Sequence, residues 1–248
     1  INSGYSGKPV LDVNSIVDTK SSRNIPSLPL DSINLFDKSQ VKFYKDNPVV
    51  RRCLQIIKQR RLSRAINKPI ALYVSLNDFI HKNRLCIPFY DINNIITFYQ
   101  TRRILDDNSP KYLSKQYSDK TIFGLNSIDV DFPYIFVVEG PIDAMFVKNG
   151  VAVCGTSMTK LQLKQLRQFP THEIIWCLDN QHVDATSKKK TLEILSEGYK
   201  VFIWPDNILY KDFNKYCTMN NINEFDYNII LNNSNTNAAS ALLSSIKF

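Results

Sequence analysis

Apolar residues are spaced in two ways along the chain, and the spacing changes near Phe132. From there on, short apolar runs alternate with segments whose apolar residues recur every three to four positions; the runs predict strands and the recurring segments predict helices. The predicted strands are residues 134–138, 151–154, 173–178 and 200–204, and the predicted helices are residues 141–149, 160–168, 184–197 and a short one from about Asp212. Gly150 and Gly198 follow two of these helices, where a glycine commonly ends the helix. This alternation predicts a parallel sheet covered by helices on both faces.

The chain before Phe132 has a mixed pattern of helix and strand. Residues 48–61 are predicted to form a helix with apolar residues on one face and arginine and lysine on the other. Residues 85–90 and 95–100 are β-prone runs on either side of two asparagines. Two such runs around a short asparagine turn predict an antiparallel hairpin.

These patterns predict an α/β fold in four parts. Residues 1–24 are polar and are interpreted as a linker, and residues 25–131 as a basic, mixed α+β subdomain. Residues 132–215 are predicted to form the parallel-sheet domain, and residues 216–248 a short helical C-terminal segment with its helix at 238–246.

Composition narrows the class of protein. The chain has 248 residues, 44% of them hydrophobic, so it can bury a sizeable core. Its net charge of +8 favours a polyanionic partner, although simple solubility explains the same charge. No apolar run is long enough to span a membrane, so we expect no membrane association. The five cysteines are scattered without a CxxC pair, which indicates free thiols in a reducing compartment and no zinc site within the chain.

Acidic residues stand just after the ends of the predicted strands. Glu139 and Asp179 follow two of them, and Asp143 lies in the first turn of the helix after Glu139. Asp206 and Asp212 follow the last strand, and Asp206 is the weaker candidate because capping a turn is enough to explain it. Ligands bind at the carboxyl ends of parallel strands, and carboxylates crowded there repel one another unless a cation neutralises them. Because oxygen ligands suit Mg²⁺, we expect Glu139, Asp143, Asp179 and Asp212 to hold Mg²⁺, with Mn²⁺ as an alternative.

Basic residues lie in and after the predicted hairpin, interleaved with tyrosines. The candidates are Arg84, Arg102, Arg103 and Lys111. Such groups suit phosphate contacts, and the tyrosines suit base stacking. An ordinary solvated loop explains the same spacing equally well. The basic face of residues 48–61 is likewise either a solvated surface or a phosphate contact.

Several segments resemble a known family. Residues 138–144 (VEGPIDA) and 178–180 (LDN) resemble motifs of the TOPRIM fold, and residues 155–159 (GTSMT) and 211–214 (KDFN) resemble primase segments beside them. Four upstream segments resemble, in the same order, the basic subdomain before TOPRIM in bacterial-type primases: residues 84–90, 98–102, 110–113 and 122–125. The chain thus resembles the TOPRIM-containing DNA primases, most strongly their T-even phage branch.

The resemblance implies DNA-templated synthesis of short RNA primers from ribonucleoside triphosphates during phage DNA replication. It implies that Glu139 is catalytic, helping to deprotonate the attacking hydroxyl beside its metal, and that the four basic candidates hold template or triphosphate. Implied partners are a single-stranded DNA template and, by resemblance alone, a replicative helicase. The implied location is the cytoplasm of the host cell. Such primases also carry an N-terminal zinc module, and we expect this chain to begin after it.

One departure from the family pattern leaves alternatives open. The second TOPRIM motif usually has another carboxylate two residues after its first aspartate, where this chain has Gln181. Either one metal site is weakened, or Asp184 replaces the carboxylate, or polymerase activity is lost. A TOPRIM nuclease and a non-catalytic nucleic-acid-binding replication factor therefore stay as alternatives.

Overall fold

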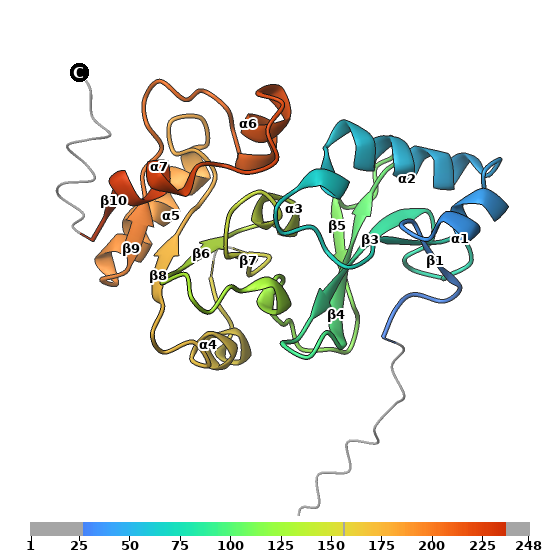
Figure 1. Cartoon of the computed structure of the whole chain (residues 1–248), viewed down its shortest axis with the longest axis horizontal. Helices are drawn as coiled ribbons and strands as arrows, with labels where there is room; N and C mark the ends of the chain where they lie inside the picture. Colours follow the sequence, from blue (N-terminus) through green and yellow to red (C-terminus); the bar gives the residue numbers. More distant parts are fainter. Residues whose placement is uncertain (1–26, 156, 237–248) are drawn as a thin grey trace, which may run out of the picture.

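The computed structural model of the protein describes residues 27–155 and 157–236, and in these ranges it contains two five-stranded sheets (Figure 1). The predicted linker 1–24 and the predicted helix 238–246 lie outside the described residues, as does Thr156 in the loop after the second predicted strand. None of the helices in the described ranges is long and apolar enough to cross a membrane.

The first sheet is antiparallel, and its strands follow chain order: β1 (Ser32–Asn34), β2 (Tyr73–Ser75), β3 (Arg84–Tyr90), β4 (Ile96–Arg103) and β5 (Tyr112–Ser114). The pairing of β3 with β4 confirms the predicted hairpin. Asn94 takes the left-handed backbone conformation in the turn, with φ 64°. The carboxylate of Asp91 accepts hydrogen bonds from the backbone N–H groups of Asn93 and Ile95, so polar side chains close this turn.

Two helices and a 3₁₀ turn lie between β1 and β2: α1 (Lys38–Phe43), α2 (Pro48–Gln59) and η2 (Leu62–Arg64). Helix α2 confirms the helix predicted at 48–61, with an end two residues earlier. Asn47 caps its start by accepting hydrogen bonds from two backbone N–H groups, and Pro48 fits the first position because it needs no donor there. Four apolar residues of α2 are buried: Val50, Cys53, Ile56 and Ile57.

The second sheet has the strand order β10-β9-β8-β6-β7. Its strands are β6 (Tyr134–Val138), β7 (Gly150–Ala152), β8 (Glu173–Trp176), β9 (Lys200–Phe202) and β10 (Ser234–Asn235), and its helices are α3 (Pro141–Ala144), α4 (Lys160–Leu166), α5 (Ala185–Ser196), α6 (Phe213–Met219) and α7 (Tyr227–Asn232), with the 3₁₀ turn η3 (Leu125–Ser127) before β6. Strands β6 to β9 run parallel, which confirms the predicted alternation. Only the edge strand β10, which was not predicted, runs antiparallel among the described strands of this sheet.

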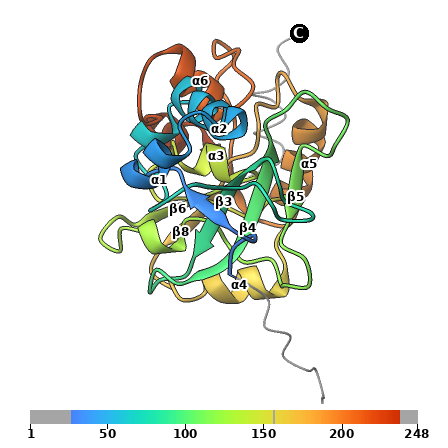
Figure 2. The same ribbon diagram turned by 90° about the vertical axis from the view of Figure 1, so that its right-hand side faces the viewer.

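Side chains of β6 alternate between two hydrophobic clusters, so both faces of the second sheet are covered. Ile135 and Val137 pack with residues of α4 and α5, whereas Phe136 and Val138 pack with residues of α3 and α6. Figure 2 shows α6 above α3 in the upper half of the view, with α2 nearer the viewer. The cluster that contains Phe136 and Val138 also contains buried residues from helices and strands of the first half of the chain.

The two sheets share this core. The rings of Phe89 in β3 and Phe123 lie 5.4 Å apart, and the backbone of Phe123 exchanges two hydrogen bonds with Ala152 at the edge strand β7. The larger of the two hydrophobic clusters contains buried side chains from both sheets, the first being Ile33 and the last Ile230. The boundary predicted at residues 131 and 132 stays a prediction, because no break in the core marks it.

The two glycines predicted to end helices have different roles. Gly198 follows α5 with φ 85°, as predicted. The prediction for Gly150 is wrong, because α3 ends at Ala144 and Gly150 begins β7. A Cβ at Gly150 would lie 2.6 Å from the carbonyl oxygen of Ala144 and 2.7 Å from that of Val147. Close backbone packing, and not a helix end, explains this glycine.

Candidate active site

The connection from β6 to α3 carries the first two predicted metal ligands. Glu139 directly follows β6, Gly140 is the N-cap residue of α3, and Pro141 occupies the first helical position. Asp143 lies in the first turn, where its Oδ1 accepts a hydrogen bond of 3.0 Å from the backbone N–H of Asn214. This bond joins the start of α6 to α3.

Asp179 and Asp212 come from two later loops that one buried asparagine holds together. Asp179 follows β8, and Asp212 is the N-cap residue of α6. The backbone N–H of Asn180 donates a hydrogen bond of 2.8 Å to the carbonyl oxygen of Lys211. The side-chain amide of Asn180 donates another, of 2.7 Å, to the carbonyl oxygen of Ile208. The loop before Asp212 is thereby fixed beside Asp179.

All four predicted ligands line one pocket of about 380 Å³. We call Glu139, Asp143, Asp179 and Asp212 the acidic side of this pocket. The rest of its lining includes basic, aromatic and amide side chains from the first half of the chain: Arg60, Gln100, Arg102, Lys111 and Tyr112. The structure therefore brings the predicted carboxylates together and adds a basic side that belongs to another sheet.

The acidic side is electrostatically crowded. Burial, followed by the charges of Glu139 and Asp212, raises the pKa of Asp179 to about 7. The pKa of Asp143 is raised well above its ordinary value by burial and by Asp212 and Asp179. Burial also raises the pKa of Glu139. Neighbouring carboxylates thus disfavour the charges of Asp143 and Asp179, and a bound cation would offset this repulsion.

The donor set of the pocket fits Mg²⁺, although it is not a closed cage. Among the residues that the structure describes, no three His, Cys, Asp or Glu side chains are grouped so that they could hold a metal ion as they stand. Mg²⁺ prefers oxygen ligands and usually keeps several waters, being held by one or two carboxylates together with substrate phosphates. Crowded carboxylates of raised pKa in an open pocket are consistent with that mode of binding.

The basic side is built on the pair of strands β4 and β5. Arg102 of β4 lies opposite Tyr112 of β5; its guanidinium donates a hydrogen bond to the phenol oxygen, and its carbon Cζ lies 5.2 Å from the ring centroid. The Lys111 ammonium lies 5.6 Å from the same centroid. Burial, followed by the charges of Arg102 and Arg60, lowers the pKa of Lys111. These cations repel one another, so an anion in the pocket would stabilise all three.

The structure does not bring Arg84 or Arg103 to the pocket. Arg84 is buried, and its guanidinium donates hydrogen bonds to the side chains of Thr101 and Ser109 and to the carbonyl oxygen of Pro110. Arg103 follows Arg102 in β4 and donates instead to carbonyl oxygens of the 107–109 loop. Both hold the loop before β5 in place.

Gln181 does not face the acidic side. It is buried, and its amide nitrogen donates hydrogen bonds of 3.1 Å to Thr191 Oγ1 and 2.9 Å to the carbonyl oxygen of Phe202, while its oxygen accepts one of 3.2 Å from the N–H of Trp204. The amide is thus used to join α5 to β9. Asp184 caps the start of α5 and does not line the pocket.

Arg60 is a pocket residue that sequence reasoning left undecided. It follows α2, and its guanidinium donates a hydrogen bond of 2.8 Å to Asn214 Oδ1, while the Asn214 amide donates one of 3.0 Å to the Arg60 carbonyl oxygen. Because Asn214 also donates to Asp143, one asparagine connects the basic and acidic sides. The basic face of α2 was visible in the sequence, but which of its residues meets α6 depends on contacts across 154 positions.

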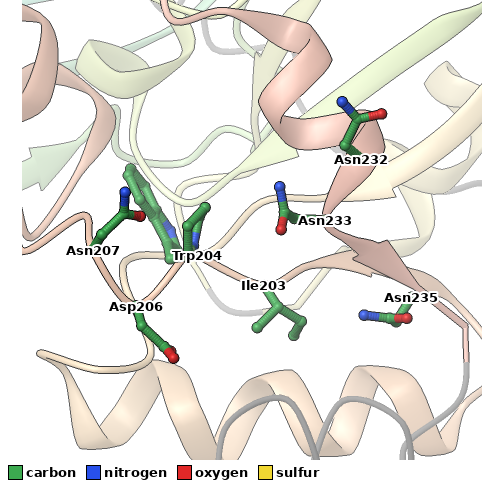
Figure 3. A pocket seen from close by; sticks show the side chains of 8 residues that line it. Ile203, Trp204, Asp206, Asn207, Asn232, Asn233 and Asn235 are labelled. Carbon is green, nitrogen blue, oxygen red and sulfur yellow. The ribbon is translucent and has the colours of Figure 1, made fainter.

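Asp206 lies in a different cavity, of about 500 Å³ (Figure 3). Asparagines dominate the lining of that cavity, which stands at the end of β9: Asn207, Asn232, Asn233 and Asn235. One carboxylate oxygen of Asp206 lies 3.3 Å from His182 Nε2. The weaker metal candidate is therefore separate from the other four carboxylates.

Comparison with known proteins agrees with this geometry. Residues 136–217 match the family model described as Toprim-like. Over 129 residues the chain is 30% identical to the DNA primase of Enterobacteria phage T4, which covers 50% of this chain and 35% of that protein. The chain therefore contains a Toprim-like domain and is similar to DNA primases, and it spans about a third of the length of the phage relative.

Solved primase structures share the fold. The E. coli primase catalytic core matches with a TM-score of 0.50 and 19% identity, covering 83% of this chain and 66% of that one. The RNA polymerase domain of Mycobacterium tuberculosis primase DnaG, in complex with a double-stranded DNA oligomer with a 6-nucleotide overhang, matches with a TM-score of 0.50 and 22% identity, covering 64% and 55%. At these identities the likeness concerns the fold.

Proposed function

We propose that this chain is the catalytic core of a DNA primase, which synthesises short RNA primers on a single-stranded DNA template from ribonucleoside triphosphates. One observation carries the proposal: a pocket in which four carboxylates of a Toprim-like sheet meet Arg102, Lys111 and Tyr112 of an antiparallel sheet. A reaction between two polyanions needs both kinds of group, cations for the phosphates and carboxylates for the metal.

The roles of the side chains follow from the reaction. The 3′-hydroxyl oxygen of the primer bonds to the α-phosphorus of the incoming nucleotide, the bond from that phosphorus to the β-phosphate oxygen breaks, and pyrophosphate leaves. Glu139 accepts the hydroxyl proton, which its raised pKa favours. Arg102 and Lys111 hold the phosphates in line. The four carboxylates of the acidic side would hold Mg²⁺ or Mn²⁺, which supplies charge stabilisation to the phosphate oxygens.

The proposed partners follow from the same assignment. The M. tuberculosis relative is described in complex with DNA, and we propose a single-stranded DNA template and ribonucleoside triphosphates as ligands of this pocket. A replicative helicase as partner, phage DNA replication as the setting and the cytoplasm of the host cell as location rest on the likeness to the T4 primase.

A primed template tests the chemistry directly. Chain extension by labelled ribonucleotides with Mg²⁺, on a DNA template carrying a short annealed RNA, requires no initiation. We expect extension by the wild-type chain and a loss of about 10³-fold in Glu139→Gln, because the metal ligand and proton acceptor are removed together. Asp206→Asn is the matched control, since it also neutralises a carboxylate near a strand end but lies in the other cavity. Template cleavage would select a nuclease, and binding without either product a non-catalytic factor.

A further inference from the structure

Lys211 lies in the candidate active site but was given no role by its sequence motif. It lines the pocket, and its ammonium nitrogen lies 2.8 Å from Asp184 Oδ2 and 4.0 Å from Asp179 Oδ2. Its carbonyl oxygen accepts the hydrogen bond from the Asn180 backbone. Both the main chain and the side chain of Lys211 are therefore anchored to the loop that carries Asp179.

The anchor of this lysine is itself connected to Glu139. Asp184 Oδ1 accepts hydrogen bonds of 3.0 Å from the backbone N–H groups of Thr186 and Ser187 at the start of α5. The Ser187 hydroxyl donates a hydrogen bond of 3.5 Å to Glu139 Oε1. Asp184 thus connects the Lys211 ammonium to the start of α5, which contacts Glu139 through Ser187.

We propose that Lys211 is a tethered counter-ion of the acidic side, which shields Asp179 before a divalent ion arrives and competes with that ion for Asp179. This inference rests on the metal site of the proposed function. Two cations beside one carboxylate repel each other, and at a separation of a few ångströms near a protein surface this repulsion is appreciable. The lysine therefore offsets part of the carboxylate repulsion in the metal-free pocket and weakens metal binding, and the nucleotide's phosphates compensate for that weaker binding.

The test measures metal binding without requiring any reaction. Mn²⁺ is titrated into the full chain and followed by electron paramagnetic resonance in the wild type, Lys211→Met and Lys211→Gln. We expect the dissociation constant to fall by about 3- to 10-fold in both neutral variants. Lys215→Met is the matched control, since it removes the same charge from an exposed side chain four residues away, outside the pocket lining, and should stay within about 2-fold of wild type.

Two further variants make the outcome decisive. Lys211→Arg keeps the charge and should retain wild-type affinity, whereas Glu139→Gln should remove the Mn²⁺ binding that the wild type shows. Equal dissociation constants in the Lys211→Met and Lys215→Met variants, with binding that still depends on Glu139, would overturn the counter-ion role alone. If no variant shows binding that depends on Glu139, the metal site of the proposed function is overturned as well, and the counter-ion role with it.

Discussion

The two sheets contribute to the pocket in different ways. In the parallel sheet the predicted carboxylates stand in the connections that follow strands, and all but the weaker candidate Asp206 reach the pocket. In the antiparallel sheet the predicted basic residues stand in strands or beside them, and only Arg102 and Lys111 reach it, although Arg103 adjoins Arg102. Parallel strands end at one edge of a sheet, so the residues that follow them start close together and loop contacts decide which of them enter the pocket, whereas neighbours within a strand point to opposite faces.

The largest loss of stability is expected at Gln181, which follows β8 of the parallel sheet but does not line the pocket. Gln181→Glu should lower the free energy of unfolding by about 3 kcal/mol, because it places a charge where the amide now serves three hydrogen bonds. Denaturant unfolding of Gln181→Glu beside Gln168→Glu, the same change on an exposed helix end, measures the difference. If Gln181→Glu kept the stability of the wild type and bound Mg²⁺ more tightly, Gln181 would face the metal site after all.

In the antiparallel sheet, Arg102 lines the pocket and its neighbour Arg103 does not. Arg102→Ala should weaken binding of a single-stranded DNA oligomer by about tenfold, and should reduce the slope of log affinity against log salt by about 1, because one phosphate contact is lost. Arg103→Ala removes the same charge from the other face of β4 and should leave most of the slope unchanged. Equal slopes in the two variants would mean that the pocket is not where phosphate binds.

A smaller effect on stability is expected from two carboxylates of the loop between β8 and α5, Asp179 and Asp184. The pKa of Asp179 is about 7 in the folded protein against an ordinary 3.8, so its charge destabilises the fold progressively as pH rises from about 4 to 7. In metal-free protein above pH 7, Asp179→Asn should therefore unfold about 2–4 °C higher than wild type, and the difference should vanish below pH 4. Added Mg²⁺ should reduce this difference, because the ion binds the wild type more tightly than a variant that lacks one of the four carboxylates.

Asp184→Asn should show the opposite sign. Hydrogen bonding with Lys211 lowers the pKa of Asp184, so its charge contributes stability that is present above its ordinary pKa and lost as pH falls through the lowered value. Thermal unfolding of both variants over the same pH range checks the pair. If both variants shifted the unfolding temperature in the same direction, the charges of Asp179 and Asp184 would not have opposite effects on stability.

Sequence reasoning succeeded where local rules decide the structure. Apolar runs predicted the four parallel strands, Asn93-Asn94 predicted the hairpin turn, and strand ends predicted the carboxylates of one pocket. It failed where side-chain direction or distant contacts decide. Arg84 is a residue type that often binds phosphate, but its guanidinium donates hydrogen bonds to Thr101 in β4 and to Ser109 and Pro110, about 25 residues later in the chain, which no local pattern reveals. Arg60 meets Asn214 for the same non-local reason.

The contacts between the 60–67 segment and the C-terminal third of the chain have a consequence for synthesis on the ribosome. Arg60 bonds to Asn214, Arg61 bonds to Asn223, and the backbone N–H of Ile66 donates to the carbonyl oxygen of Asn223. At about 5–20 residues per second, the ribosome adds these partners on the order of ten seconds or more after the arginines. The first sheet is therefore synthesised before the segments that complete the pocket, and the pocket can form only after residue 223 has left the ribosome.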